Sequence, residues 1–98
     1  MFRLEFQPEA EEKLVYLQLR QPKIYKKVLK TLGLMQEDRK HPSLKTHKFK
    51  SLAGPNGEEI WECYVDTDWR VFWYDGPGQG VMTIFAMYPK NDKVFKTR

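Results

Sequence analysis

The spacing of the apolar residues changes once along the chain, at His41-Pro42, and this change constrains the fold more than any other feature. Before it, apolar residues recur every three or four positions, which is typical of amphipathic helices. After it, short runs rich in Val, Ile, Phe, Trp and Tyr alternate with turns that contain Gly and Pro, which indicates strands. The sequence therefore predicts an α+β domain whose helical part comes first.

Two helices are expected before His41-Pro42, the first over about residues 8–20. Pro8 suits its first turn, and Pro22 starts the second helix after a very short link. The two apolar stripes consist of Ala10, Leu14 and Leu17, and of Ile24, Val28, Leu32 and Met35. Helices joined so tightly lie antiparallel, so the pattern predicts a helical hairpin.

The remaining elements are predicted to be strands. Residues 2–6 alternate apolar and charged side chains, as a half-buried strand does. Further runs of strand-forming residues lie at about 47–52, 60–66, 69–75 and 80–88. We expect one domain over residues 1–98: an N-terminal strand, the antiparallel helical hairpin, and a four-stranded antiparallel meander. The helices should cover one face of a twisted, mostly antiparallel sheet.

The charged residues are unevenly distributed. Residues 39–50 carry five lysines or arginines and no acid, whereas residues 58–68 carry five acids and no base. The net charge of +4 and the pI near 9.2 therefore conceal a basic and an acidic stretch. Such a basic surface favours nucleic acid or an acidic protein as partner.

Several classes of protein are disfavoured by the composition. Cys63 is the only cysteine, so no intramolecular disulfide can form. No signal peptide is recognisable, and no run approaches the ~20 apolar residues of a membrane span, so we expect a cytoplasmic protein. His41, His47 and Cys63 lack the spacing of a metal site, and we expect no metal or other cofactor.

Alternation along two predicted strands suggests a functional surface. Lys48 and Lys50 should project from one face of their strand. Arg70, Phe72 and Tyr74 should share a face of another strand. If both sets lie on the same face, the sheet presents cations beside aromatic rings, a surface that holds phosphates and stacks unpaired bases.

A second interpretation of the same strands is purely structural. Phe72 and Tyr74 then belong to the core, and Arg70 pairs with Asp66 or Asp68. For the aromatic residues alone, the core is the more common location. The acidic stretch, including Glu62, is then a solvated strand end rather than a Mg²⁺ site.

The chain resembles the RelE/ParE superfamily of toxins from bacterial toxin–antitoxin pairs. The resemblance rests on the order of elements and on residues 44–52, 68–73 and 81–88. It covers nearly the whole chain and implies a RelE/ParE-like fold. The superfamily includes ribosome-dependent messenger-RNA interferases and gyrase-poisoning toxins.

The resemblance also implies a set of catalytic residues. The Lys-x-Lys pair of the superfamily's nucleases is matched by Lys48 and Lys50, and their fourth-strand arginine by Arg70. Lys90 is the nearest match to the basic residue after the last strand. Near the C-terminus, Phe95 stands where those nucleases carry an aromatic hydroxyl.

The chemistry implied is RNA cleavage without metal, in which the ribose 2′-OH attacks the adjacent phosphate. Arg70 would stabilise the phosphorane, and Lys48 or Lys50 would abstract the proton. Tyr88 or His47 would replace the missing proton donor. The residues expected to contact RNA are Lys45, His47, Phe72, Tyr88, Lys93 and Phe95.

Two functions are carried forward from the sequence. The first is an endoribonuclease toxin that cleaves messenger RNA on the ribosome and inhibits translation. The second is a relative without nuclease activity, either a gyrase-directed toxin or an antitoxin-binding module. Both predict a cognate antitoxin with an acidic or amphipathic segment as partner.

Overall fold

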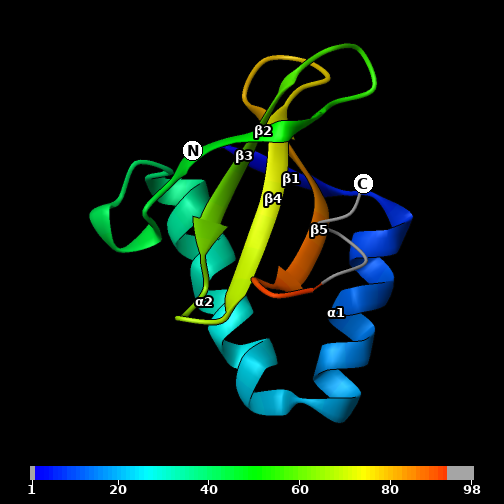
Figure 1. Ribbon diagram of the computed structural model, residues 1–98, viewed down its shortest axis with the longest axis vertical. Helices are drawn as coiled ribbons and strands as arrows, with labels where there is room; N and C mark the ends of the chain where they lie inside the picture. Colours follow the sequence, from blue (N-terminus) through cyan, green and yellow to red (C-terminus); the bar gives the residue numbers. More distant parts are fainter. Residues whose placement is uncertain (1, 93–98) are drawn as a thin grey trace.

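A computed structural model describes residues 2–92 of the chain, and it consists of a twisted sheet with two helices against one face (Figure 1). The elements, in chain order, are β1 (Arg3–Phe6), α1 (Pro8–Arg20), α2 (Pro22–Glu37), the 3₁₀ helix η1 (Pro42–Leu44), β2 (His47–Ala53), β3 (Glu59–Tyr64), β4 (Trp69–Asp75) and β5 (Val81–Pro89). The predicted α+β class, helical hairpin and four-stranded meander are confirmed.

The sheet has five strands in the order β1-β5-β4-β3-β2. Strands β2 to β5 pair antiparallel in sequence order, and β1 adds to the free edge of β5 in parallel orientation. The pairing of β2 with β3 is irregular between Lys48 and Ala53. The β2 edge is therefore the least regular part of the sheet.

Both helices begin at a proline, as the sequence predicts. Pro8 and Pro22 occupy the first turns, where a missing backbone N–H costs nothing. The second helix ends at Glu37, before the expected boundary at His41-Pro42, and Pro42 instead opens η1. No helix within residues 2–92 is long and apolar enough to cross a membrane.

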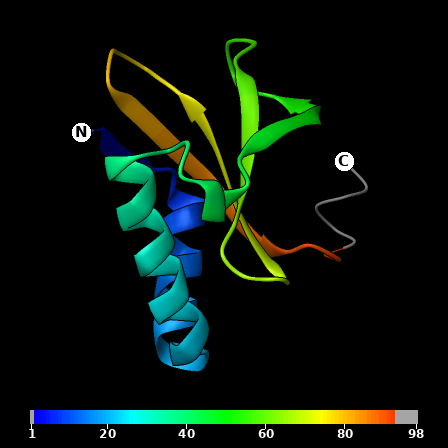
Figure 2. The same cartoon turned by 90° about the vertical axis from the view of Figure 1, so that its left-hand side faces the viewer.

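The main core lies between the helices and the face of the sheet turned toward them, here called the helix-side face (Figure 2). The predicted helical stripes point into it: Leu17, Val28 and Met35 are fully buried. The sheet contributes Cys63, Val71, Trp73, Met82 and Ile84, among others.

A second, smaller cluster covers part of the opposite face, here called the outer face. It joins Ile60, Phe72, Tyr74 and Ala86, with Phe49 and Phe85 packed against them. In Figure 2, β2 lies on the side of the sheet away from the helices. Its Phe49 ring stands edge-on to Phe72, with 5.1 Å between the ring centroids.

Candidate functional site

Polar and aromatic side chains cross the outer face at the end of the sheet near the β3–β4 turn (residues 65–68). The strand register sets Tyr64 opposite Arg70 and Arg70 opposite Tyr88. The next row sets His47 opposite Glu62. We call this group the outer-face site, and it consists of Lys45, His47, Glu62, Tyr64, Arg70 and Tyr88.

His47 and Glu62 form the closest polar contact of the outer-face site. His47 Nε2 lies 2.6 Å from Glu62 Oε1, and His47 Nδ1 lies 2.8 Å from the Lys45 carbonyl oxygen. A carbonyl oxygen only accepts, so Nδ1 carries a hydrogen, and one further proton is shared between Nε2 and the Glu62 carboxyl. The two side chains are 49% and 15% exposed, so the pair can exchange protons with a bound molecule.

The backbone at Lys45 positions this pair. Lys45 follows η1 in a left-handed conformation, with φ of +49° and ψ of +42°. Its carbonyl oxygen binds His47 Nδ1, and its ammonium lies 5.3 Å from the Tyr64 ring centroid. Lys45 therefore contributes a cation to the site and fixes which ring nitrogen of His47 faces Glu62.

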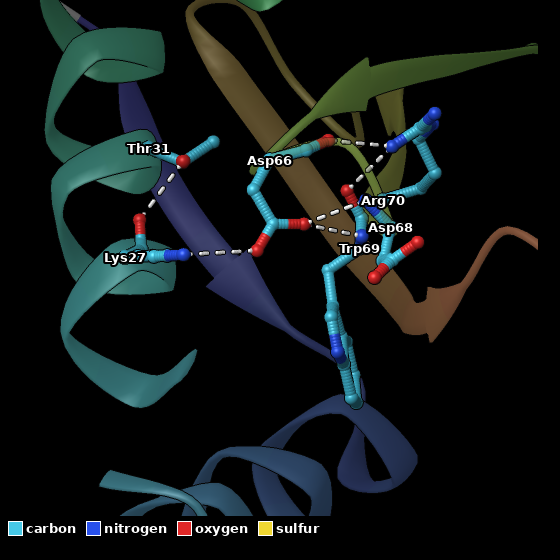
Figure 3. Close-up of polar contacts among 6 residues, drawn as sticks. All are labelled: Lys27, Thr31, Asp66, Asp68, Trp69 and Arg70. Carbon is cyan, nitrogen blue, oxygen red and sulfur yellow. Dashed lines mark hydrogen bonds and ion pairs between the residues drawn. The ribbon is translucent and has the colours of Figure 1, made fainter. Parts of the chain in front are cut away.

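Arg70 is only 5% exposed and binds the β3–β4 turn (Figure 3). Its Nη1 donates to the carbonyl oxygens of Asp66, at 2.8 Å, and Trp69, at 3.0 Å, while Nη2 lies 3.4 Å from that of Thr67. The guanidinium stacks on Tyr64, 3.5 Å from the ring centroid. Arg70 thus holds the turn and keeps a positive charge under the Tyr64 ring.

Arg70 binds within its own protein, as the structural interpretation predicts, but its partner differs from the one predicted. Pairing with the carboxylate of Asp66 or Asp68 was expected, whereas the contact is with the Asp66 carbonyl oxygen. The Asp66 carboxylate instead accepts from the backbone N–H groups of Asp68 and Trp69, at 2.8 and 2.7 Å. Lys27 of α2 reaches the same carboxylate at 3.3 Å (Figure 3).

These contacts determine the protonation of Asp66. Burial raises the pKa of its carboxyl, but the two backbone N–H donors and the Lys27 ammonium together outweigh burial and hold the pKa below its ordinary value. Asp66 therefore stays ionised and ties α2 to the turn that Arg70 stabilises. The outer-face site rests on this support.

Lys48 does not lie on the face that bears Arg70. It pairs with Trp61 across the strands, its ammonium binds Glu59 at 3.0 Å, and Trp61 packs against the main core on the helix-side face. Phe49 takes the outer-face position beside Phe72 because successive strand residues point to opposite faces. The interpretation that places Lys48 beside Arg70 is therefore wrong.

The other predicted residues have varied positions. Lys50 is exposed on β2 and lines a shallow hollow with Lys48 and Glu59. Phe72 is 3% exposed, so the prediction that it stacks on RNA is wrong: β2 covers it, as the core interpretation of Phe72 and Tyr74 expects. Lys93 and Phe95 lie outside the described residues.

Tyr88 and Lys90 lie at the end of β5. The Tyr88 hydroxyl donates to Glu9 of α1 at 2.7 Å, and the Lys13 ammonium lies 4.7 Å from its ring centroid. Lys90 is exposed just beyond the strand, and its backbone N–H donates to the Asp68 carbonyl oxygen. Tyr88 therefore belongs to the outer-face site opposite Arg70, and Lys90 borders it next to the β3–β4 turn.

The basic and acidic stretches are neighbours in the sheet. Most of the basic stretch leads into or forms β2, and most of the acidic stretch forms β3. Two cross-strand contacts, Lys48 with Glu59 and His47 with Glu62, join them. The basic and acidic stretches therefore partly neutralise each other across β2 and β3.

Glu62 and Tyr64 are the site residues that sequence reasoning missed. Both precede the turn before Arg70, and alternation across an antiparallel hairpin would have placed them on its face. Within residues 2–92, no three His, Cys, Asp or Glu side chains are grouped so that they could hold a metal ion. The chemistry that the site offers is proton transfer beside fixed cations.

Solved structures with the same fold are found at low sequence identity. YoeB from Staphylococcus aureus, solved as a dimer, is 19% identical over 89% of this chain and 94% of that chain, with a TM-score of 0.69. The archaeal RelE-RelB complex from Pyrococcus horikoshii is 15% identical over 93% of this chain and 97% of that chain, with a TM-score of 0.68. A metal-bound toxin from Helicobacter pylori is 17% identical over 95% of this chain and 99% of that chain, with a TM-score of 0.72.

By sequence, no family model and no curated protein matches the chain. The structural comparisons nevertheless agree on one architecture over nearly its whole length. The fold is that of RelE- and YoeB-like toxins, so the fold expected from the sequence resemblance is confirmed.

Proposed function

We propose that this chain, which has a RelE/ParE-like fold, is the toxin of a toxin–antitoxin pair and a metal-independent endoribonuclease that cleaves messenger RNA on the ribosome. The similar structures are of toxins, two of them named above as YoeB and RelE, and this supports the toxin role. The observation that carries the proposed activity is the His47–Glu62 pair beside the Arg70 and Lys45 cations on one face of the sheet.

Cleavage begins when the ribose 2′-OH attacks the adjacent phosphorus. Glu62 accepts the 2′-OH proton while the new O2′–P bond forms. His47 Nε2 donates its proton to the leaving 5′-oxygen as the P–O5′ bond breaks, giving a 2′,3′-cyclic phosphate and a free 5′-hydroxyl. The proton then passes from Glu62 to His47 across their 2.6 Å contact, which restores the pair.

The two cations act on the charge that develops at phosphorus. The Arg70 guanidinium is bonded to the turn and acts through its fixed charge. The Lys45 ammonium, on an exposed residue, can contact a phosphate oxygen directly. DNA lacks the 2′-OH and is inert to this chemistry, and the ribosome would orient the RNA.

The test is to induce the chain in cells and to map the 5′ ends of messenger RNA. Glu62→Gln and His47→Gln should each lower cleavage by about 10²–10⁴, since each removes a proton-transfer group. Glu59→Gln is the matched control, because Glu59 is a carboxylate on the same strand that pairs with Lys48. Intact messenger RNA during growth arrest, or unchanged cleavage in both site variants, would refute the nuclease proposal.

The antitoxin is proposed to bind the outer surface of the helical hairpin through an acidic, amphipathic segment. Large apolar side chains are exposed there: Val15, Tyr16, Leu19 and Leu29. The second helix carries four lysines and one acid, which favours an acidic partner. The protein encoded by an adjacent short acidic reading frame should bind the purified chain, and Leu19→Asp should abolish this binding.

A second candidate function is supported by two observations. The Arg70 guanidinium is occupied by its own turn, and Lys48 lies on the other side of the sheet. Both fit a relative without nuclease activity, such as a gyrase-directed toxin or an antitoxin-binding module. Purified protein would then inhibit DNA supercoiling by gyrase and leave messenger RNA intact, whereas normal supercoiling excludes the gyrase-directed form.

A further inference from the structure

A cavity of about 330 Å³ lies where the segment between α2 and β2 passes the helix-side residues Trp61 and Trp73. We call it the loop pocket. Its wall includes Arg39, Lys40, His41 and Lys45 from the segment, and the two tryptophans from β3 and β4. Trp61 and Trp73 lie on the face of the sheet opposite Arg70 and Glu62, so the pocket and the outer-face site lie on opposite faces and share only Lys45.

The titratable side chains that line the loop pocket have charge of one sign, although the carboxylates of Asp38 and Asp75 lie close by. Every titratable residue in its wall is a base. Arg39 is already paired with Asp75, and the Lys45 ammonium lies over Tyr64. Lys40 makes no ion pair with the part of the chain that the structure describes, so its ammonium is available to an anion.

His41 adds an N–H donor next to Lys40. Its Nδ1 accepts a hydrogen bond from the Ser43 backbone N–H at 3.2 Å, so the neutral ring carries its hydrogen on Nε2. No group within residues 2–92 accepts from this Nε2–H. An ammonium and an imidazole N–H together suit a phosphate.

The tryptophans give the pocket a flat, apolar wall. Trp61 is half-buried, and Trp73 is 1% exposed. The Trp73 indole N–H has no acceptor within residues 2–92 and is itself buried, so a molecule in the pocket does not reach this donor. A flat ring would therefore pack mainly on the half-buried Trp61 indole.

We propose that the loop pocket binds a nucleoside monophosphate. The base packs against the Trp61 ring beside Trp73, and the phosphate lies at Lys40 and His41 Nε2. A nucleotide joins a flat ring to a phosphate, which matches the flat wall beside a cationic rim. Binding requires no cleavage, so the proposal does not depend on nuclease activity.

The test is a titration of ¹⁵N-labelled protein, followed by the indole N–H resonances of its three tryptophans, which Trp→Phe variants assign. Adenosine 5′-monophosphate should shift the Trp61 and Trp73 signals to saturation and leave that of Trp69, in the main core near the β3–β4 turn, unchanged. Adenosine, without the phosphate, should bind at least fivefold more weakly.

Charge variants test the phosphate position without disturbing the core. Lys40→Gln should weaken binding of the nucleotide at least fivefold and leave binding of adenosine unchanged. Lys26→Gln, an exposed lysine of α2 away from the pocket, is the control and should change neither. Absence of a saturable shift, equal binding of nucleotide and nucleoside, or equal weakening by both variants would overturn the proposal.

Discussion

Glu62 lies directly opposite His47 on the neighbouring strand, and this register determines the chemistry of both residues. Without His47, Glu62 would be a half-buried carboxylate on an acidic strand. Without the Lys45 carbonyl, either nitrogen of His47 could carry the hydrogen. The proton transfer that we propose for the outer-face site therefore depends on the three residues together.

The first prediction separates this pair from the lysine that the sequence favours. Lys48→Ala should leave messenger-RNA cleavage within about twofold of the unmodified chain, because Lys48 faces away from Arg70 and its exposed ion pair with Glu59 contributes only about 0–1 kcal/mol. Mapping of messenger-RNA 5′ ends checks it. A loss as large as that of Glu62→Gln would return Lys48 to the catalytic group.

The second prediction concerns Asp66. Asp66→Ala should lower the free energy of unfolding at pH 7 by about 1–3 kcal/mol, because two backbone N–H groups lose their acceptor and Lys27 loses its partner. Urea unfolding monitored by tryptophan fluorescence measures the loss. Asp68→Ala is the control, since the Asp68 side chain is exposed and makes no hydrogen bond or ion pair with residues 2–92.

The same residue predicts a dependence of stability on pH. The pKa of Asp66 is lower in the folded chain than in the unfolded chain, so ionised Asp66 stabilises the fold above its ordinary pKa. This stabilisation disappears as the pH falls through the folded-state pKa. The difference in unfolding free energy between the unmodified chain and Asp66→Ala should therefore shrink in acid, and a constant difference would contradict the assignment.

The third prediction concerns Cys63. Burial raises the pKa of its thiol from 9.0 to about 12, and Sγ lies 3.7 Å from Met35 Sδ in the main core. The native protein should not react with a chromogenic disulfide reagent at pH 8, whereas the protein unfolded in guanidinium should react at once. Between pH 9.0 and about 12 the Cys63 thiol ionises in the unfolded chain but not in the folded chain. Its contribution to the free energy of unfolding should therefore fall as the pH rises through this range.

At the scale of the elements, the helical hairpin has one face buried against the sheet and an opposite, exposed face that we propose to bind the antitoxin. Leu17 is fully buried against the sheet, whereas Leu19, two positions later, is 74% exposed. The helical period turns these two leucines to different sides of α1. One leucine therefore belongs to the core, and the other to the surface proposed for the antitoxin.

The fourth prediction uses these leucines as a matched pair. Leu17→Ala should lower the unfolding free energy by about 2–5 kcal/mol, because it leaves a cavity in the main core. Leu19→Ala should change it by less than about 0.5 kcal/mol. Thermal or urea unfolding of the two variants measures the difference, and similar losses would contradict the assignment of faces.

The elements themselves were largely predictable, and the reason is local. Proline at the first turn and a regular apolar stripe define α1 and α2, and their predicted starts agree with the structure. Alternation correctly grouped Arg70 with Phe72 and Tyr74 on one face of β4. Local patterns determine these features before any tertiary contact forms.

The candidate site was less predictable because alternation divides a strand into two sides without saying which side the helices cover. That choice placed Lys48 on the helix-side face and Phe72 under Phe49. The contact between His47 and Glu62 depends on the register of β2, which is irregular beyond Lys48. Register of this kind is set by the packing of Phe49 and Leu52 on the outer face, which one sequence does not reveal.

For the molecule as a whole, the central strands of the sheet have more pairing and packing contacts than the β2 edge. β4 and β5 lie between paired neighbours and contribute to both clusters, whereas β2 is an edge strand with irregular pairing. Local opening should therefore begin at β2. The loop that precedes β2 carries residues of both the outer-face site and the loop pocket.

The fifth prediction follows from this inequality. Backbone amides of β4 should exchange with solvent only on global unfolding, whereas those in the middle of β2, over residues 49–52, should exchange at least tenfold faster. Hydrogen exchange followed by nuclear magnetic resonance measures both rates in one sample. Equal protection of the two strands would show that β2 opens only with the whole fold.

The neighbouring arrangement of β2 and β3 has a consequence for how the protein would respond to salt. A basic protein that neutralises phosphates releases condensed counterions. The logarithm of its affinity therefore falls linearly with the logarithm of the salt concentration, and the slope is proportional to the number of phosphates contacted. Lys48, Lys27 and Arg39 already hold carboxylates as their counterions. The salt sensitivity of RNA binding should therefore reflect the cations that both contact RNA and hold no carboxylate within residues 2–92, such as Lys45, rather than the total basic charge of the chain.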